Sequence, residues 1–167
     1  MNTLVIGCGN ILKGDDGFGP AVIKHLENHY MPSRDTQIID AGLACGEWLR
    51  PLIIDDDRPD WIIIIDTMDL GKEPGEIDIL QAQDLPQIPP QASSHFFPDR
   101  NIIEAILETG TKITFVACQY KQISSELTTE LSREVHDAVP KVAKVVAKLT
   151  GLKEKDANNT AKQGNIN

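Results

Sequence analysis

Three aspartates that follow short apolar segments are the side chains best placed to do chemistry. Asp16 lies in the glycine-rich stretch GCGNILKGDDGFG, Asp40 follows the segment TQII, and Asp66 follows WIIII. Ligands of open parallel sheets bind where the carboxyl ends of the strands meet, so we expect these three acids to share that edge. Clustered carboxylates repel one another less when they hold a cation. Oxygen ligands alone favour magnesium or calcium, and an added imidazole favours nickel, zinc or another transition metal.

Each acid also has an ordinary interpretation, because aspartate is common in turns and at helix N-termini. That interpretation suits Asp15 best, and it stays open for Asp40. Asp66 is harder to explain in this way, because it interrupts a strongly apolar segment and a buried carboxylate needs a partner. We therefore expect Asp66 and Asp16 to be the acids with a function.

One histidine can supply an imidazole to the same edge. His95 lies in SSHFFPD, within the proline-rich segment 84–98, and loops of that length in compact domains are often functional. The segment precedes a predicted helix whose chain returns to the sheet, so it can reach the edge. The other histidines, His25, His29 and His136, occupy polar positions of predicted helices and are interpreted as surface residues.

A nucleotide is the alternative ligand for the glycine-rich turn. The dinucleotide pattern G-x-G-x-x-G fits Gly7 and Gly9, but its third position is Leu12. Two unit charges ~4 Å apart interact by about 4 kcal/mol at an effective dielectric constant of 20, so Asp16 would oppose a pyrophosphate. Asp40 favours a nucleotide, because it lies where a ribose-binding acid would end the second strand. A dinucleotide-binding Rossmann-like enzyme therefore stays an alternative.

The elements that must position these residues alternate between strand and helix along the chain. The unbroken run of four isoleucines before Asp66 is typical of a central parallel strand that is covered on both faces. This order predicts an α/β fold, a three-layer sandwich with a mostly parallel central sheet flanked by helices on both faces. Residues 1–151 are expected to form a single domain, and residues 152–167 a polar, flexible tail. The predicted strands are 3–8, 36–39, 61–66, 75–81 and 112–118, and the predicted helices are 17–29, 44–52, 98–109 and 128–149.

Composition narrows the class of partner. The formal net charge of −9 argues against nucleic acid or an anionic membrane, because both require a basic surface. No apolar segment approaches the ~20 residues of a membrane span, and no signal peptide is visible. Three distant cysteines, Cys8, Cys45 and Cys118, predict neither a disulfide framework nor a thiolate zinc site. We therefore expect a cytoplasmic protein, and a monomer.

Taken together, these motifs resemble the hydrogenase maturation endopeptidases. GCGNILKGDDGFG, IDAG, IIIIDTMDLGKEPGEI and SSH occur in the order found in that family, and the resemblance covers about residues 2–150. It implies an endopeptidase that removes the C-terminal extension of a [NiFe] hydrogenase large-subunit precursor after nickel insertion. It further implies that Asp16, Asp66 and His95 contact the nickel and that Asp40 assists proteolysis or orients the site. Many relatives carry glutamate at the position of Asp16.

The resemblance also implies that the nickel is carried by the nickel-loaded precursor, the expected partner, and is not permanently bound to this chain. A non-catalytic nickel carrier remains a further alternative. For hydrolysis two routes are open: the metal polarises the carbonyl or activates water, or a carboxylate, Asp16 or Asp40, is the general base. An aspartic-type dyad is conceivable, but the sequence lacks the D-[ST]-G motif of pepsin-like enzymes. The opening loop resembles members from methanogens that serve the deazaflavin-reducing hydrogenase.

Overall fold

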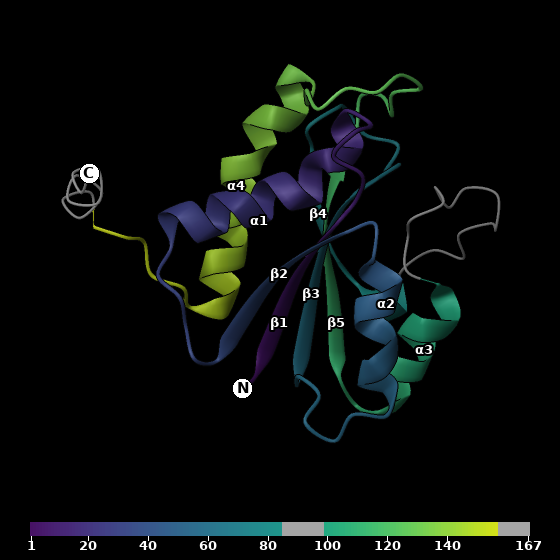
Figure 1. The fold of residues 1–167 in the computed structure, drawn as a ribbon, viewed down its shortest axis with the longest axis vertical. Helices are drawn as coiled ribbons and strands as arrows, with labels where there is room; N and C mark the ends of the chain where they lie inside the picture. The colour runs from purple at the N-terminus through teal and green to yellow at the C-terminus, as the bar shows by residue number, and fades with distance from the viewer. Residues whose placement is uncertain (85–98, 157–167) are drawn as a thin grey trace, which may run out of the picture.

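A mostly parallel sheet forms the central layer of the molecule (Figure 1). The computed structural model describes residues 1–84 and 99–156, and within these ranges the sheet has five strands in the order β2-β1-β3-β5-β4. Neighbouring strands are parallel, except that β4 runs antiparallel to β5 at one edge. The strands are β1 (Thr3–Cys8), β2 (Thr36–Gly42), β3 (Trp61–Met68), β4 (Ile77–Gln81) and β5 (Lys112–Gln119).

Helices cover both faces of this sheet (Figure 1). α1 (Phe18–His29) and α4 (Arg133–Thr150) pack on one face, whereas α2 (Cys45–Leu49) and α3 (Arg100–Glu108) pack on the other. The isoleucines of β3 alternate between the two layers: Ile63 and Ile65 join the core under α1 and α4, and Ile62 and Ile64 join the core under α2 and α3. All four are fully buried, as a strand covered on both faces requires. The predicted three-layer α/β sandwich is therefore confirmed.

Several predicted boundaries move. β2 continues to Gly42 and β3 continues past Asp66 to Met68, so both acids lie inside the last residues of their strands. The last helix begins at Arg133 and not at residue 128, because Thr128 instead forms an isolated bridge with Lys13, as Ile123 does with Gly14. α3 spans Arg100–Glu108, inside the predicted 98–109.

The segment after α4 lies against the end of α1. Leu152 is buried in the core under α1 and α4. The Met31 N–H donates to the Lys153 carbonyl oxygen, and the Lys155 N–H donates to that of His29, both at 2.8 Å. The predicted polar tail is therefore held in place over residues 152–156, and its remainder lies outside the described residues.

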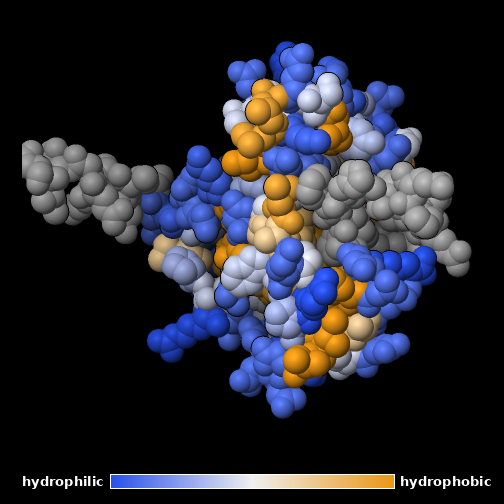
Figure 2. Space-filling model, turned by 45° about the vertical axis from the view of Figure 1, so that its right-hand side comes forward, coloured by the Kyte–Doolittle hydropathy of each residue, from blue (hydrophilic) through white to orange (hydrophobic). Residues whose placement is uncertain are grey.

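The surface is mostly hydrophilic, but apolar patches interrupt it (Figure 2). Among the large apolar side chains that are exposed in the described residues are Ile11, Leu12 and Leu127. Leu12 and Leu127 belong to neighbouring segments, because the Thr128 N–H donates to the Leu12 carbonyl oxygen at 3.0 Å. Over residues 1–84 and 99–156, no helix combines the length and the apolar character that crossing a membrane requires.

Cys8 at the end of β1 and Cys45 at the start of α2 form a disulfide, with their Cα atoms 5.6 Å apart. The prediction that the cysteines form no disulfide is therefore wrong for this pair. Their separation of 37 residues concealed the contact. Cys8 pairs in register with Gly42, and the chain enters α2 three residues later, so the turn after β2 returns to the end of β1. Cys118 is free and buried.

Gly19 allows the start of α1 to touch the sheet. A Cβ at this position would clash with the Cys8 carbonyl oxygen and lie 2.6 Å from that of Ile65. Both neighbours are backbone atoms of central strands, so neither can move aside. The absence of a side chain at Gly19 therefore brings the turn that precedes α1 close to the ends of β1 and β3.

Substituting this glycine is expected to destabilise the fold. Gly19→Ala should cost about 3 kcal/mol through overpacking, which corresponds to a Tm lowered by about 6–12 °C. Gly46→Ala is the matched control, because a Cβ there would meet only Ile102 Cδ1 at 3.9 Å and alanine favours the helix. Thermal unfolding followed by circular dichroism measures both, and an equal Tm for the two variants would contradict the close approach at Gly19.

Candidate active site

Asp66 is a buried carboxyl group near the end of β3. Its side chain is 5% exposed, and its Oδ1 accepts a hydrogen bond from the Thr67 N–H at 2.7 Å. Burial raises the pKa of Asp66 from 3.8 to about 8, and the charge of Asp16 acts in the same direction, against the Thr67 hydrogen bond. Asp66 therefore holds its proton at neutral pH.

Asp16 is the second buried acid and comes from the turn before α1. It lies in the short 3₁₀ turn η1 (Asp15–Gly17), is 4% exposed, and accepts a hydrogen bond from the Asn10 N–H at 2.9 Å. Burial raises the pKa of Asp16, whereas the Asn10 hydrogen bond and the charge of Lys13 oppose that rise. Both acids of the pair therefore sit in surroundings that disfavour their charged forms.

Gly9 lies between the two acids. Its φ of +127° belongs to the region that favours glycine, and a Cβ there would clash with the Asp16 carbonyl oxygen. The same Cβ would lie 3.8 Å from Asp66 Oδ1. The glycine therefore lets the loop after β1 fold tightly enough to bring Asp16 next to the end of β3. We call Asp16 and Asp66 the carboxyl pair.

Asp40 lies on the same edge but in different surroundings. It pairs in register with Gly7, and its side chain is exposed. Its Oδ1 accepts a hydrogen bond from the Gly42 N–H at 3.1 Å, as a turn aspartate does. The turn itself is tied to the site, since the Gly42 carbonyl oxygen accepts from the Gly9 N–H at 2.9 Å. The structure thus places Asp40 on the edge without burying it with the carboxyl pair.

His95, the predicted imidazole, lies outside the described residues. Within the part of the chain that is described, no group of three histidine, cysteine, aspartate or glutamate residues is arranged to hold a metal ion. Two of the other histidines lie on the surface as predicted: His29 stacks against the half-buried His25 with ring centroids 4.0 Å apart, and His136 is exposed beside Asp137.

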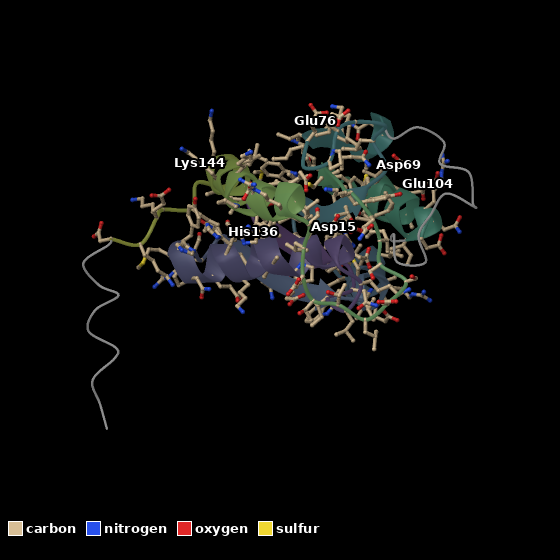
Figure 3. The ribbon with its side chains drawn as sticks, turned by 90° about the horizontal axis from the view of Figure 1, so that it is seen from above. Asp15, Asp69, Glu76, Glu104, His136 and Lys144 are labelled. Atoms are coloured by element: carbon tan, nitrogen blue, oxygen red, sulfur yellow. A yellow bond between two sulfur atoms is a disulfide. The ribbon has the colours of Figure 1, made fainter. Side chains whose placement is uncertain are left out.

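Asp15, the neighbour of Asp16 that is labelled in Figure 3, is a structural acid. It is 1% exposed and accepts hydrogen bonds from the backbone after β5 and from Ser132 at the start of α4. The sequence predicts a cap or turn acid here, but the partners of Asp15 lie 106 to 117 residues away and not in its own turn. The hydrogen-bond partners of Asp15 could not be predicted from the sequence. The roles of Gly9 and Asn10 were also missed, although both residues belong to the G-x-G-N pattern at residues 7–10.

Comparisons with known proteins agree on one family. The HycI family, described as hydrogenase maturation protease, matches residues 20–149. A protein of Methanocaldococcus jannaschii, named provisionally as a hydrogenase maturation protease, is 32% identical over 145 residues, which cover 86% of this chain and 92% of that protein. The delta subunit of coenzyme F420 hydrogenase from Methanothermobacter thermautotrophicus is 31% identical, and the alignment covers 89% of this chain and 94% of that subunit.

The fold has the same relatives. The hydrogenase maturating endopeptidase HybD of Escherichia coli aligns with a TM-score of 0.77 and 24% identity, covering 95% of this chain and 99% of HybD. At that identity the likeness shows a shared fold. The matched family model and the two relatives above 30% identity confirm the resemblance drawn from the motifs. This chain therefore belongs to the hydrogenase maturation protease family, and it is a peptidase.

Proposed function

We propose that this peptidase removes the C-terminal extension of a [NiFe] hydrogenase large-subunit precursor after nickel insertion, and that Asp16, Asp66 and His95 contact the nickel. The carboxyl pair carries the proposal, because a chain of this protease family presents two adjacent buried acids at the ligand-binding edge of its sheet. A relative that is 28% identical is named as the Escherichia coli hydrogenase 3 maturation protease.

The protonation of the pair fits an encounter with a cation. Asp66 is protonated at neutral pH, so the two acids avoid mutual repulsion when no cation is near. Carboxylates bind metal in their deprotonated form, so the nickel of the precursor would displace this proton. Two carboxylates and one imidazole also leave coordination positions for ligands from the precursor. The nickel therefore belongs to the substrate.

Asp16 is the better candidate for the general base of hydrolysis. A base must accept a proton. In the free protein Asp66 is already protonated at neutral pH, and the nickel that displaces this proton would take the carboxylate as a ligand. The Asn10 hydrogen bond and the charge of Lys13 favour the carboxylate form of Asp16. Asp40 is exposed and bound to its own turn through Gly42, so we assign it a supporting role in holding that turn. The nickel would polarise the scissile carbonyl or activate the attacking water.

Two further features support a protein substrate. The exposed side chains of Ile11, Leu12 and Leu127 belong to the loop that carries Asp16 and to its neighbouring segment, so the edge offers apolar as well as acidic contacts. The alternative of a dinucleotide-binding enzyme disagrees with the protease family. The negative charge of the buried Asp16 would also repel a bound pyrophosphate.

The mass of the precursor tests this function. Incubating this chain with nickel-loaded precursor should shorten the precursor at its C-terminus, whereas nickel-free precursor should keep its full mass, because recognition requires the metal. Intact-mass spectrometry over time measures both. Cutting of the nickel-free form at the same rate would refute nickel recognition. Tight nickel binding by this chain alone, without any shortening of the precursor, would instead favour a nickel carrier.

A further inference from the structure

Asp15 makes more hydrogen bonds than a turn aspartate requires. Oδ2 accepts from the Lys121 N–H at 2.9 Å, the Gln122 N–H at 3.2 Å and the Ser132 hydroxyl at 3.0 Å. Oδ1 accepts from the Ser132 N–H at 2.6 Å. These four donors occupy the acceptor capacity of a carboxylate, and the side chain is 1% exposed. Asp15 therefore binds the protein itself and is not available to a ligand.

These bonds join three parts of the chain that are far apart in sequence. The partners of Asp15 lie 106 to 117 residues away, in the segment after β5 and at the start of α4. Backbone bonds extend the same connection: the Gly14 N–H donates to the Thr128 carbonyl oxygen at 2.9 Å, and the Ser124 N–H donates to that of Lys13 at 3.2 Å. Residues 12–15 are thus attached to residues 121–132 along their length.

The attachment matters because the loop that carries the carboxyl pair is rich in glycine. Gly9, Gly14 and Gly17 surround Asp16, and glycines give a backbone more freedom than other residues. Asp15 and Asp16 are consecutive, with Cα atoms about 3.8 Å apart, so a movement of one moves the other. Asp15, whose side chain anchors this loop to Ser132 at the start of α4, is therefore next to the acid that must stay beside Asp66.

We propose that Asp15 is a positioning residue of the protease, whose carboxylate fixes η1 so that Asp16 stays beside Asp66. The expected effect on the reaction rate rests on the proposed function. A displacement of about 1 Å in a catalytic group can cost on the order of 100-fold in rate. The loss of Asp15 should therefore act on the chemical step and leave binding of the precursor in place.

Asp15→Asn tests the proposal and keeps the size of the side chain. Each carboxylate oxygen of Asp15 accepts a hydrogen bond from a backbone N–H. In either orientation of the asparagine amide, its NH₂ group replaces one of these oxygens and cannot accept that bond, so at least one hydrogen bond is lost. We expect kcat for nickel-loaded precursor to fall about 10- to 100-fold, with KM within about threefold of the wild-type value. Ser132→Ala removes one donor of the four and should lower kcat by a smaller factor.

Asp99→Ala is the matched control. Asp99 caps α3 by accepting from the Asn101 N–H at 2.9 Å, on the opposite face of the sheet, so its loss weakens a helix start without touching η1. This variant should keep the wild-type kcat even where its Tm falls as far as that of Asp15→Asn. Equal kcat values for Asp15→Asn and Asp99→Ala would overturn the proposal.

A second readout does not depend on activity. The Asn10 N–H donates to Asp16 Oδ2, so its hydrogen exchange, followed by NMR, reports whether Asp16 stays in place. Exchange at Asn10 should speed up at least about tenfold in Asp15→Asn and stay unchanged in Asp99→Ala. Unchanged exchange in Asp15→Asn would overturn the positioning role. If the wild-type chain cuts no precursor, the proposed function fails, and the exchange rates still decide the role of Asp15.

Discussion

Replacing either acid of the carboxyl pair by asparagine is expected to reduce processing of nickel-loaded precursor by at least about 100-fold, the scale on which an acid or base contributes. Asp16→Asn removes the proposed base, and Asp66→Asn removes a group that can lose its proton to a cation. Asparagine keeps the oxygen that accepts from Asn10 or Thr67, so both variants should fold. The rate at which the precursor loses mass, measured in single turnovers, gives the effect directly.

Two other acids serve as controls for this result. Asp78 on β4 is separated from Asp66 by β5 and forms an ion pair with Lys72 at 2.7 Å, so Asp78→Asn should leave the rate unchanged. Asp40→Asn keeps an oxygen for the Gly42 N–H and should lower the rate by less than tenfold. His95→Ala should behave like the carboxyl-pair variants. Full processing by all three variants at Asp16, Asp66 and His95 would refute the assignment of the site.

The acids at the edge could be predicted because their signal is local. Four isoleucines in a row followed by Asp66 indicate a buried strand that ends in an acid, and parallel strands place such ends together. The glycine pattern around Asp16 likewise indicates a tight turn. The burial of Asp66 agrees with its apolar strand, whereas the burial of Asp16 could not be predicted, because Asp16 lies in a turn between a strand and a helix.

The features that escaped prediction all depend on contacts between distant residues. The Cys8–Cys45 disulfide requires the register of β1 with β2, and the start of α4 at Arg133 requires the anchoring of Ser132 by Asp15. The helical spacing of apolar residues continues through this region, so periodicity alone begins the helix too early. The exposure of Asp40 has a similar origin, because β2 lies at the edge of the sheet and the order of the strands depends on pairing between distant segments.

The stability of the protein should depend on pH through Asp66. In the unfolded chain its pKa is close to 3.8, and in the folded protein burial raises the pKa to about 8. Between these values the folded state binds one more proton than the unfolded state, so the free energy of unfolding falls as pH rises. Below pH 4 both states are protonated, and above about pH 8 the full cost is present. The displaced pKa corresponds to at most about 6 kcal/mol.

Asp66→Asn removes this dependence, because asparagine does not titrate. The free energy of unfolding of Asp66→Asn, minus that of the wild type, should therefore increase from pH 4 to pH 8. Urea unfolding of both proteins across that pH range measures this difference. Asp78→Asn is the control, since Asp78 is partly exposed on β4 and forms an ion pair there. A difference that stays constant with pH would show that Asp66 is ionised in the folded protein. Suppose that Asp66→Asn is more stable than the wild type at pH 8 and still inactive. That result would show that Asp66 destabilises the fold and is retained for catalysis, because a residue retained for the fold alone would not destabilise the fold.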